Sequence, residues 1–122
     1  MDRCFAASRA VRYVAVYTRG ELRMRQREGL ADPSASESDR YEELLVNPTL
    51  LTLARQRGAI DCGGLAYLLI RYGNFFTLVQ PLGRGHVNVG FETDADLSII
   101  DVLRQVVLDW AGDDLAPTPN PD

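Results

Sequence analysis

Three apolar runs decide the fold: LAYLLIRY at 65–72, NFFTLVQ at 74–80 and HVNVGF at 86–91. Each run is short and rich in β-branched or aromatic residues, as strands are. Gly73-Asn74 and the stretch 81–85 separate the runs and contain the glycine, asparagine and proline that tight turns need. Together the runs predict a three-stranded antiparallel meander.

The first of these strands, 65–72, carries apolar side chains on both of its faces. Such a strand lies centrally in a sheet or, at an edge, is covered or paired, because a bare apolar edge promotes aggregation. In the third strand, alternation places one set of side chains toward the core and the other set toward the opposite face. The core-facing set is Val87, Val89 and Phe91, and the opposite set is His86, Asn88 and Gly90.

A β-hairpin is predicted earlier in the chain, from VRYVAVYT at 11–18, a turn at Arg19-Gly20 and ELRMRQR at 21–27. Because side chains alternate along a strand, three arginines share one face of the second strand: Arg23, Arg25 and Arg27. This row suits recognition of an anion or of a partner protein. It also suits a solvated outer strand whose charges discourage pairing at the sheet edge. The sequence leaves both interpretations open.

The middle of the chain has a helical pattern, which Ser38 or Asp39 would cap and Gly58 would end. Pro48 interrupts the pattern, and because proline favours the first position of a helix, Asn47 is expected to cap a second helix that runs to Arg57. The aliphatic residues cover more of the circumference than one sheet-facing stripe needs: Leu44, Leu45, Val46, Leu50, Leu51 and Leu53. Part of this helix is therefore expected to bury against a second body.

Four further segments complete the order of elements. Residues 2–9 predict a short first helix, 28–40 a polar, mobile loop, 95–112 a helix capped by Thr93 or Asp94, and 112–122 a disordered tail. The broad apolar face of the last helix requires docking on the sheet. The chain thus predicts one α/β domain over 1–111, an α+β sandwich whose five-stranded antiparallel sheet lies between helices. The expected order is helix, strand, strand, helix, strand, strand, strand, helix.

Composition limits the classes of function. Of 122 residues, 46% are hydrophobic and 25% charged. No apolar run approaches the roughly 18 residues of a membrane span, so membrane insertion is not expected. The net charge of −4 argues against a nucleic-acid partner, since the phosphate backbone needs a basic footprint. The first residues lack the features of a secretory signal, so we expect a cytoplasmic protein. Cys4 and Cys62 could form one disulfide, but a reducing compartment favours two free thiols, with packing roles.

No catalytic set stands out in the sequence. His86 is the only histidine, so a histidine-based triad or a multi-histidine metal site is excluded. GRGH at 83–86 lacks the spacing and the lysine of a phosphate loop and is predicted to be a hairpin turn. Glu42 and Glu43 are expected to interact with a helix dipole and with solvent, and not to act as an acid and a base. We therefore expect a protein that is not an enzyme and that holds no metal or cofactor.

The order of elements resembles the roadblock/LC7 family, small α/β domains with one antiparallel sheet between helices. The resemblance covers about residues 8–110 and is carried by VRYVAVYTRGELRMRQR, PTLLTLARQRG, LAYLLIRYGNFFTLVQPLGRGHVNVGF and DLSIIDVLRQVVL. The chain departs from the family pattern in its short first helix and in Pro48. The resemblance implies a roadblock-like or profilin-like fold and a non-enzymatic regulatory platform of the bacterial kind.

In that family, the middle helix and the first strand of the meander form a two-fold dimer in which two sheets join edge to edge. Those elements correspond here to 41–57 and 65–72, where the sequence has excess apolar surface, and a self-complementary patch of this kind closes a dimer. Several family members bind small Ras-like GTPases. The implied partners are a second copy and such a GTPase or another signalling protein, contacted through the middle helices and the row of arginines. The implied dimer residues are Leu44, Leu51, Leu65, Tyr67, Leu68, Leu69 and Ile70.

A second class of function competes with this one. A profilin-like or PAS-like sensory domain would hold a small molecule between the sheet and a helix. It predicts a concave pocket with a few convergent polar groups around His86, Asn88 and Tyr67, whereas a filled core rules against it.

Overall fold

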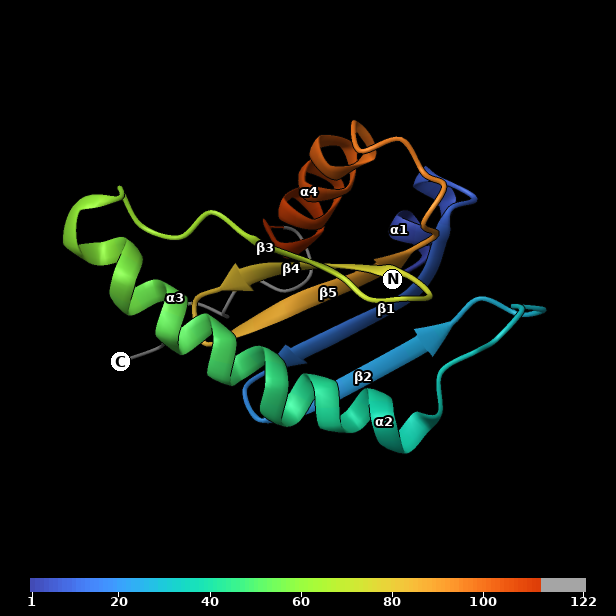
Figure 1. Cartoon of the computed structure of the whole chain (residues 1–122), viewed down its shortest axis with the longest axis horizontal. Coiled ribbons are helices and arrows are strands. Elements are labelled where there is room, and N and C mark those ends of the chain that lie inside the picture. Colours follow the sequence, from blue (N-terminus) through green and yellow to red (C-terminus); the bar gives the residue numbers. More distant parts are fainter. Residues whose placement is uncertain (113–122) are drawn as a thin grey trace.

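A five-stranded antiparallel sheet forms the central layer of the computed structural model, which describes residues 1–112 (Figure 1). The order of the strands across the sheet is β2-β1-β5-β4-β3. This confirms the predicted α+β fold, with its hairpin and its meander in one sheet. The strands are β1 (Val11–Thr18), β2 (Glu21–Gln26), β3 (Leu68–Arg71), β4 (Phe76–Leu82) and β5 (Gly85–Phe91).

Two helices, α1 (Asp2–Ala7) and α4 (Ile99–Trp110), cover one face of the sheet. Side chains from β1, β4 and β5 pack beneath them, including the core-facing set predicted for the last strand of the meander. The buried cluster consists of Cys4, Val11, Val14, Val16, Leu78, Val87, Val89, Phe91, Ile100, Leu103, Val107 and Trp110. This apolar layer holds α4 in place, as the broad apolar face of the predicted helix required.

One long helical segment covers the opposite face and runs along the lower side of the sheet in Figure 1. It consists of α2 (Ser36–Tyr41), a π-helical turn η1 (Glu42–Val46) and α3 (Asn47–Asp61). The predicted break at Pro48 was wrong, because Asn47 has helical dihedral angles and is not a cap. The backbone N–H of Asn47 bonds to the carbonyl of Glu42, five residues back. This wider turn accommodates the proline ring, which in a regular helix collides with the carbonyl of Leu44.

Several predicted boundaries were wrong by a few residues. The helix at 2–9 ends at Ala7, and the middle helix begins at Ser36, inside the predicted loop, and continues past Gly58 to Asp61. The first strand of the meander starts only at Leu68, so Leu65 and Tyr67 precede it. The last helix begins at Ile99, and neither Thr93 nor Asp94 caps it. Propensity signals place the ends of elements less well than their cores.

The two cysteines differ in environment. Cys4 is a buried core residue, as predicted, whereas Cys62 is exposed at the end of α3, so its predicted packing role was wrong. Both thiols are free. No helix within residues 1–112 is long and apolar enough to cross a membrane. From residue 113 onward, the predicted tail lies outside the residues that the structure describes.

Candidate functional site

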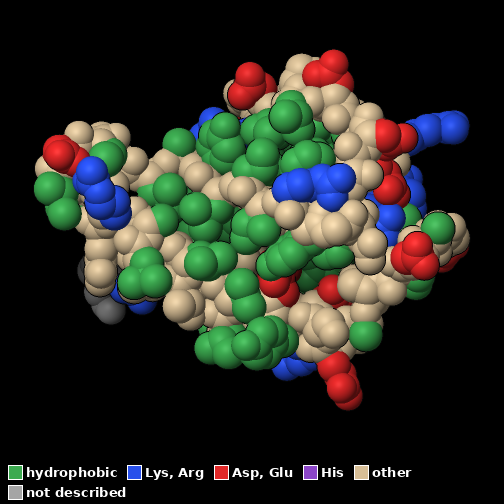
Figure 2. Space-filling view, viewed as in Figure 1, with side chains coloured by type: hydrophobic (Ala, Val, Ile, Leu, Met, Phe, Trp, Pro, Cys, Tyr) green, Lys and Arg blue, Asp and Glu red, His purple; other side chains and the backbone are tan. Residues whose placement is uncertain are grey.

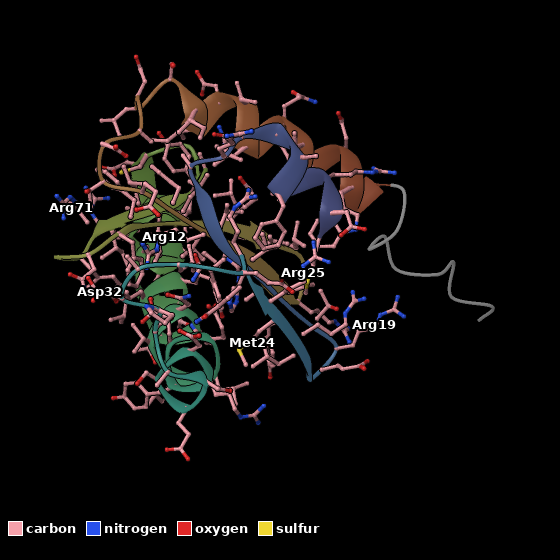
Figure 3. The ribbon with its side chains drawn as sticks, turned by 90° about the vertical axis from the view of Figure 1, so that its right-hand side faces the viewer. Arg12, Arg19, Met24, Arg25, Asp32 and Arg71 are labelled. Carbon is pink, nitrogen blue, oxygen red and sulfur yellow. The ribbon has the colours of Figure 1, made fainter. Side chains whose placement is uncertain are left out.

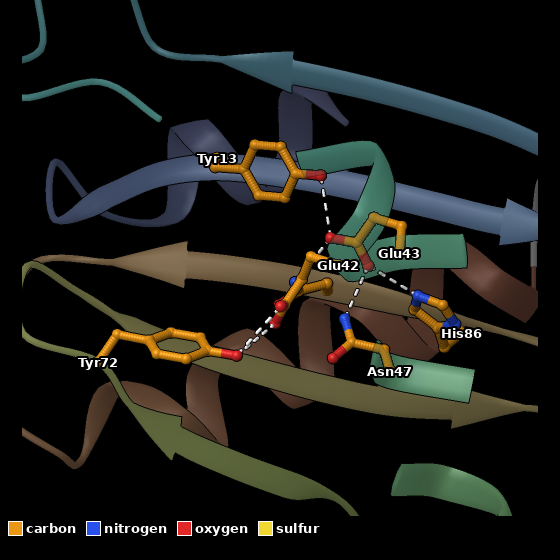
Figure 4. A network of polar contacts seen from close by, with 7 residues as sticks. Tyr13, Glu42, Glu43, Asn47, Tyr72 and His86 are labelled. Atoms are coloured by element: carbon orange, nitrogen blue, oxygen red, sulfur yellow. Dashed lines mark hydrogen bonds and ion pairs between the residues drawn. The ribbon is translucent and has the colours of Figure 1, made fainter. Parts of the chain in front are cut away.

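A buried carboxylate, Glu43, joins the long helical segment to the sheet (Figure 4). Its Oε1 accepts hydrogen bonds from Asn47 Nδ2 and His86 Nε2, both at 2.8 Å. Its Oε2 accepts from the hydroxyl of Tyr13 at 2.9 Å and from Asn88 Nδ2 at 2.8 Å. A carboxylate has about four acceptor positions, so these four donors use them all. With Glu43 as a carboxylate, which only accepts, this contact assigns the proton of the His86 ring to Nε2.

Local structure explains how these side chains meet. Asn47 follows Glu43 by one helical turn, so both side chains lie on the same, buried side of the helix. His86 and Asn88 alternate on β5, so both face the helical segment. Tyr13 on β1 lies opposite Gly90, where a Cβ atom would come within 3.3 Å of the Tyr13 Cβ atom. The glycine thus leaves room for the tyrosine ring against the sheet.

A cleft of about 740 Å³ opens beside this network, between α2, η1 and the sheet. Figure 2 shows this face of the molecule hollowed above α2, with acidic side chains in the hollow. The volume falls in the range of roughly 300 to 1,000 Å³ that is typical of ligand sites. The floor contains buried side chains, among them Tyr13, Glu43, Thr77 and Asn88, and the rim contains exposed ones, among them Glu37, Ser38, Tyr41 and Asn74.

Glu42 lines the cleft next to Glu43, and both of its carboxylate oxygens accept from the hydroxyl of Tyr72, at 3.0 and 3.1 Å. Burial raises the pKa of Glu42, although the bond from Tyr72 opposes this. Burial and the carboxylate of Glu42 raise the pKa of Tyr72 to about 12. The predicted role of Glu42 and Glu43 at a solvated helix start was wrong, because the helix begins at Ser36 and places both residues within it.

Arg12 lies at the side of the cleft and is itself buried. Its Nη1 donates to both oxygens of Glu92, at 3.0 and 3.1 Å. Its Nη2 donates to the backbone carbonyls of Ala31 at 3.2 Å and Asp32 at 3.0 Å, and Figure 3 shows Arg12 extending toward the loop that carries Asp32. The charge of Arg12 is therefore compensated by neighbouring groups, and the same bonds hold the loop at the edge of the cleft.

Two buried oxygen atoms in the floor of the cleft have no hydrogen-bond partner among the described residues. They are the hydroxyl oxygen of Thr77 and the amide oxygen of Asn88, and each side chain is 1% exposed. The orientation of the Asn88 amide follows from Glu43, because only the amide nitrogen can donate to a carboxylate. Its oxygen is therefore left to accept a bond from another donor.

The residues predicted for the dimer occupy different positions in the chain. Leu44 and Leu69 are exposed, at 42% and 37%, on η1 and on the edge strand β3. Leu51 is only 3% exposed and lies on the buried side of α3 with Asn47. The other four predicted residues are partly buried in β3 or in the segment before it: Leu65, Tyr67, Leu68 and Ile70.

Two members of the row of arginines, Arg23 and Arg25, lie on β2 at the opposite edge of the sheet, and Arg27 directly follows this strand, which ends at Gln26, one residue before the predicted end. Arg25, labelled in Figure 3, pairs with Asp2 at 2.6 Å and its guanidinium lies 4.6 Å from the ring centroid of Phe5. Arg27 donates to the backbone carbonyls of Phe5, Ser8 and Val11 and so ties α1 to the sheet. Arg23 is exposed on the same strand. Two of the three arginines thus make contacts within the chain.

The polar residues predicted around a pocket are only partly brought together. His86 and Asn88 converge on Glu43, whereas Tyr67 lies on the other face of the sheet, where the guanidinium of Arg104 in α4 stacks on its ring at 4.6 Å. Sequence reasoning assigned Glu43 to a solvated helix start, did not single out Tyr13, and predicted a pocket between sheet and helix only under the competing hypothesis of a sensory domain. The available signal was the pair His86 and Asn88 on a strand that is otherwise apolar, since buried polar side chains need a partner.

No group of three or more histidine, cysteine or acidic side chains in residues 1–112 is arranged to hold a metal ion. Three of the acidic residues around the cleft, Asp39, Glu42 and Glu43, instead make hydrogen bonds to glutamine, tyrosine and histidine side chains. Gln26 Nε2, for example, donates to Asp39 Oδ2 at 3.0 Å. The arrangement provides hydrogen-bond acceptors and negative charge beside an open cavity.

The layers and the strand order define a roadblock-like α+β fold, with one open antiparallel sheet between two helical layers. A solved structure with this fold is described as "MglB with tetrameric arrangement", and it superposes with a TM-score of 0.69 over 91% of this chain and 84% of that chain. The two sequences are 10% identical, so the likeness concerns the fold. No protein-family model matches the chain, and no curated protein matches it.

Proposed function

We propose that the chain is a non-enzymatic homodimeric adaptor, a regulatory platform that binds a small Ras-like GTPase or another signalling protein. The observation that carries this proposal is the exposed apolar face of α3. Leu53 is 60% exposed and Ile60 is 76% exposed, and the two lie about two helical turns apart on the side away from the sheet. A helix with buried and exposed apolar faces favours a second covering body.

The π turn extends this apolar face toward α2. Leu45 precedes Leu53 by eight residues, and the extra residue of the wide turn brings both to the outward side of the helix. Leu45 is 51% exposed, and Leu44 and Leu50 flank the row at 42% and 37%. Figure 2 shows hydrophobic side chains along this helix. The resulting surface is long enough to pair with its own copy around a two-fold axis.

The edge strand β3 supports the same arrangement. It pairs with β4 only, and within residues 1–112 no strand lies on its other side. Three of its four residues are apolar and its one charge, Arg71, lies at the end of the strand, and a largely apolar edge favours pairing with a second edge. The exposed Leu69 lies on this strand. Pairing through β3 would leave β2 and its arginines, at the opposite edge in Figure 1, accessible to a partner.

The fold supports the identity of the partner. The chain shares its fold with MglB, whose solved structure has a tetrameric arrangement, and the resemblance to roadblock domains implies small GTPases as partners. Arg23 is the member of the arginine row that is exposed without a contact described above, and it is therefore the candidate for contact with a partner of opposite charge.

The test of self-association is the solution mass by light scattering of wild type, Leu53→Glu and a matched control, Leu108→Glu. Leu108 is 42% exposed on α4, on the other side of the sheet. We expect a dimer for wild type and the control, and a folded monomer for Leu53→Glu, because a charge in an apolar interface is left unpaired. A monomeric wild type would refute the dimer.

The partner is tested separately. A Ras-like GTPase from the same organism is titrated against wild type and Arg23→Glu, in its GTP-bound and GDP-bound forms. We expect binding that depends on the nucleotide and weakens in the variant, with Arg84→Glu, at an exposed arginine in the turn between β4 and β5, as the charge-matched control. Equal binding by both variants would place the contact away from β2.

A further inference from the structure

We propose that the cleft between α2, η1 and the sheet binds a small organic cation with a flat apolar group. The inference does not depend on self-association or on a GTPase, since the cleft is formed within one chain. Four observations support it: the shape of the cleft, the two oxygens without partners, the charge around them and the aromatic walls.

The shape is that of an open ligand site. The floor is buried and the rim is exposed, so a molecule can enter from solvent and lose most of its hydration inside. The floor is also held rigidly, because Glu43 is bonded to the helix, to β1 and to β5 at once. A preformed floor lowers the entropy cost of binding.

Two polar groups in the floor of the cleft lack a hydrogen-bond donor within residues 1–112. The amide of Asn88 is fixed by Glu43, so its oxygen remains an acceptor, and the hydroxyl of Thr77 also lacks a partner among the described residues. Buried polar atoms without partners are rare in folded proteins and are often explained by a bound group. A ligand with N–H groups supplies what these atoms lack.

The charge around the cleft favours a cation. Three carboxylates besides Glu43 line it: Glu37, Asp39 and Glu42. The one arginine in the lining, Arg12, is compensated by Glu92 and by two carbonyls. Glu42 is partly buried and receives the hydroxyl of Tyr72, and burial disfavours its charged form. A cation beside Glu42 would stabilise the charged form of its carboxylate, which burial disfavours.

Apolar groups form the remaining walls. Val46 of the helical segment and Leu30 of the loop before it form one wall. Tyr72 and Phe75, between β3 and β4, form the other, with their ring centroids 5.5 Å apart. Gly90 on the floor carries no side chain that would project into the space. Flat apolar groups fit such walls, and a cation can also contact the faces of the aromatic rings.

The test compares two probes of similar size that share a phenyl ring but differ in charge. 2-Phenylethylamine carries an ammonium group after two methylenes, and phenylacetate carries a carboxylate after one. Each is titrated into the ¹⁵N-labelled full chain, and amide shifts are followed by NMR. We expect the amine to shift the resonances of Phe75, Thr77, Asn88 and Gly90 in the millimolar range, and phenylacetate to leave them unchanged. No shift with the amine, shifts outside the cleft, or equal shifts with both probes would overturn the proposal.

Two variants locate the contacts. Glu42→Gln keeps an acceptor for Tyr72 but removes the charge, so the affinity for the amine should fall about tenfold, as for loss of one charge-assisted bond. Glu28→Gln, an exposed residue outside the cleft, should leave the affinity unchanged. If the two variants bind the amine equally well, the charge of the cleft is not what recognises it.

Thr77→Val provides an independent check on the floor. The substitution keeps the shape of the side chain and removes a hydroxyl that has no partner among the described residues. We expect the free protein to melt at the same or a higher temperature and the amine to bind more weakly. A lower melting temperature would show that the hydroxyl is already bonded, and would overturn this part of the inference.

Discussion

Replacing Glu43 with leucine removes the acceptor that four buried donors share: Tyr13, Asn47, His86 and Asn88. A buried donor without a partner costs about 1 to 3 kcal/mol. We use the lower end because leucine also removes the cost of burying a carboxylate. The expected loss in the free energy of unfolding is about 4 kcal/mol, a large part of the roughly 5 to 15 kcal/mol of a small domain.

Glu43→Gln is the matched substitution and should cost about 2 kcal/mol or less. Its oxygen still accepts, and its nitrogen can donate to the amide oxygens of Asn47 or Asn88, which have no partner among the described residues. Urea unfolding followed by the fluorescence of Trp110, the only tryptophan, measures both values. The m value should stay unchanged if only stability is affected.

A double-mutant cycle tests the assignment of the bonds. Tyr13→Phe should cost about 1 kcal/mol in wild type, where the hydroxyl donates to Glu43. In the Glu43→Leu background the same change should cost nothing, because the hydroxyl has lost its acceptor. The argument fails if Glu43→Leu is within about 1 kcal/mol of wild type, or if Tyr13→Phe costs the same in both backgrounds.

Three further predictions concern other parts of the chain. Gly85→Ala should cost about 3 kcal/mol or more in thermal unfolding, since its Cβ would lie 1.8 Å from the carbonyl oxygen of Tyr17, whereas Gly83→Ala should be tolerated because nothing lies within 4 Å. The pKa of Glu42 is raised in the folded protein, so its contribution to stability is full below pH 4.5, its ordinary pKa, and is lost as pH rises through its pKa in the folded state. Glu42→Gln should therefore make the melting temperature depend less on pH above 4.5. The pKa of Tyr72 is raised from 10.0 to about 12, so its contribution to stability falls as pH rises from 10 to 12. An absorbance titration of tyrosinate should show a component near pH 12 that Tyr72→Phe removes.

Most of the fold could be predicted from periodicity. The strands β1, β2, β4 and β5 follow from alternating or continuous apolar runs bounded by turn residues. Short connections account for the pairing of β1 with β2 and of β4 with β5, whereas the pairing of β1 with β5 joins distant parts of the chain and is shown only by the structure. The start of β3 could not be predicted, because Leu65 and Tyr67 lie in a strand-like apolar run but precede the paired residues, and Tyr67 packs against the core beneath α4 instead. The course of the helix through Pro48 was also hidden, because proline rules describe regular helices and not a π turn.

The candidate site was harder to predict from the sequence than the fold. Glu43 lies more than forty residues from His86 and Asn88, so only the folded chain shows that they meet. Its position in the helix suggested a solvated first turn, because the start at Ser36 has no strong capping signal: the cap position is Ala35 and no side-chain cap bond forms. Periodicity did place His86 and Asn88 on the face away from the apolar core, and their burial there required a polar partner.

The unbroken course of the helix through Pro48 has a thermodynamic consequence. Its inner side forms a wall of the cleft at η1, and its outer side carries the exposed leucines of α3, so one rod borders both surfaces. Binding in the cleft and association of two copies can therefore be thermodynamically linked. If a bound molecule changes the association constant of two copies by some factor, association changes the affinity of the cleft for that molecule by the same factor. Measuring either affinity at two concentrations of the other component gives that factor in both directions.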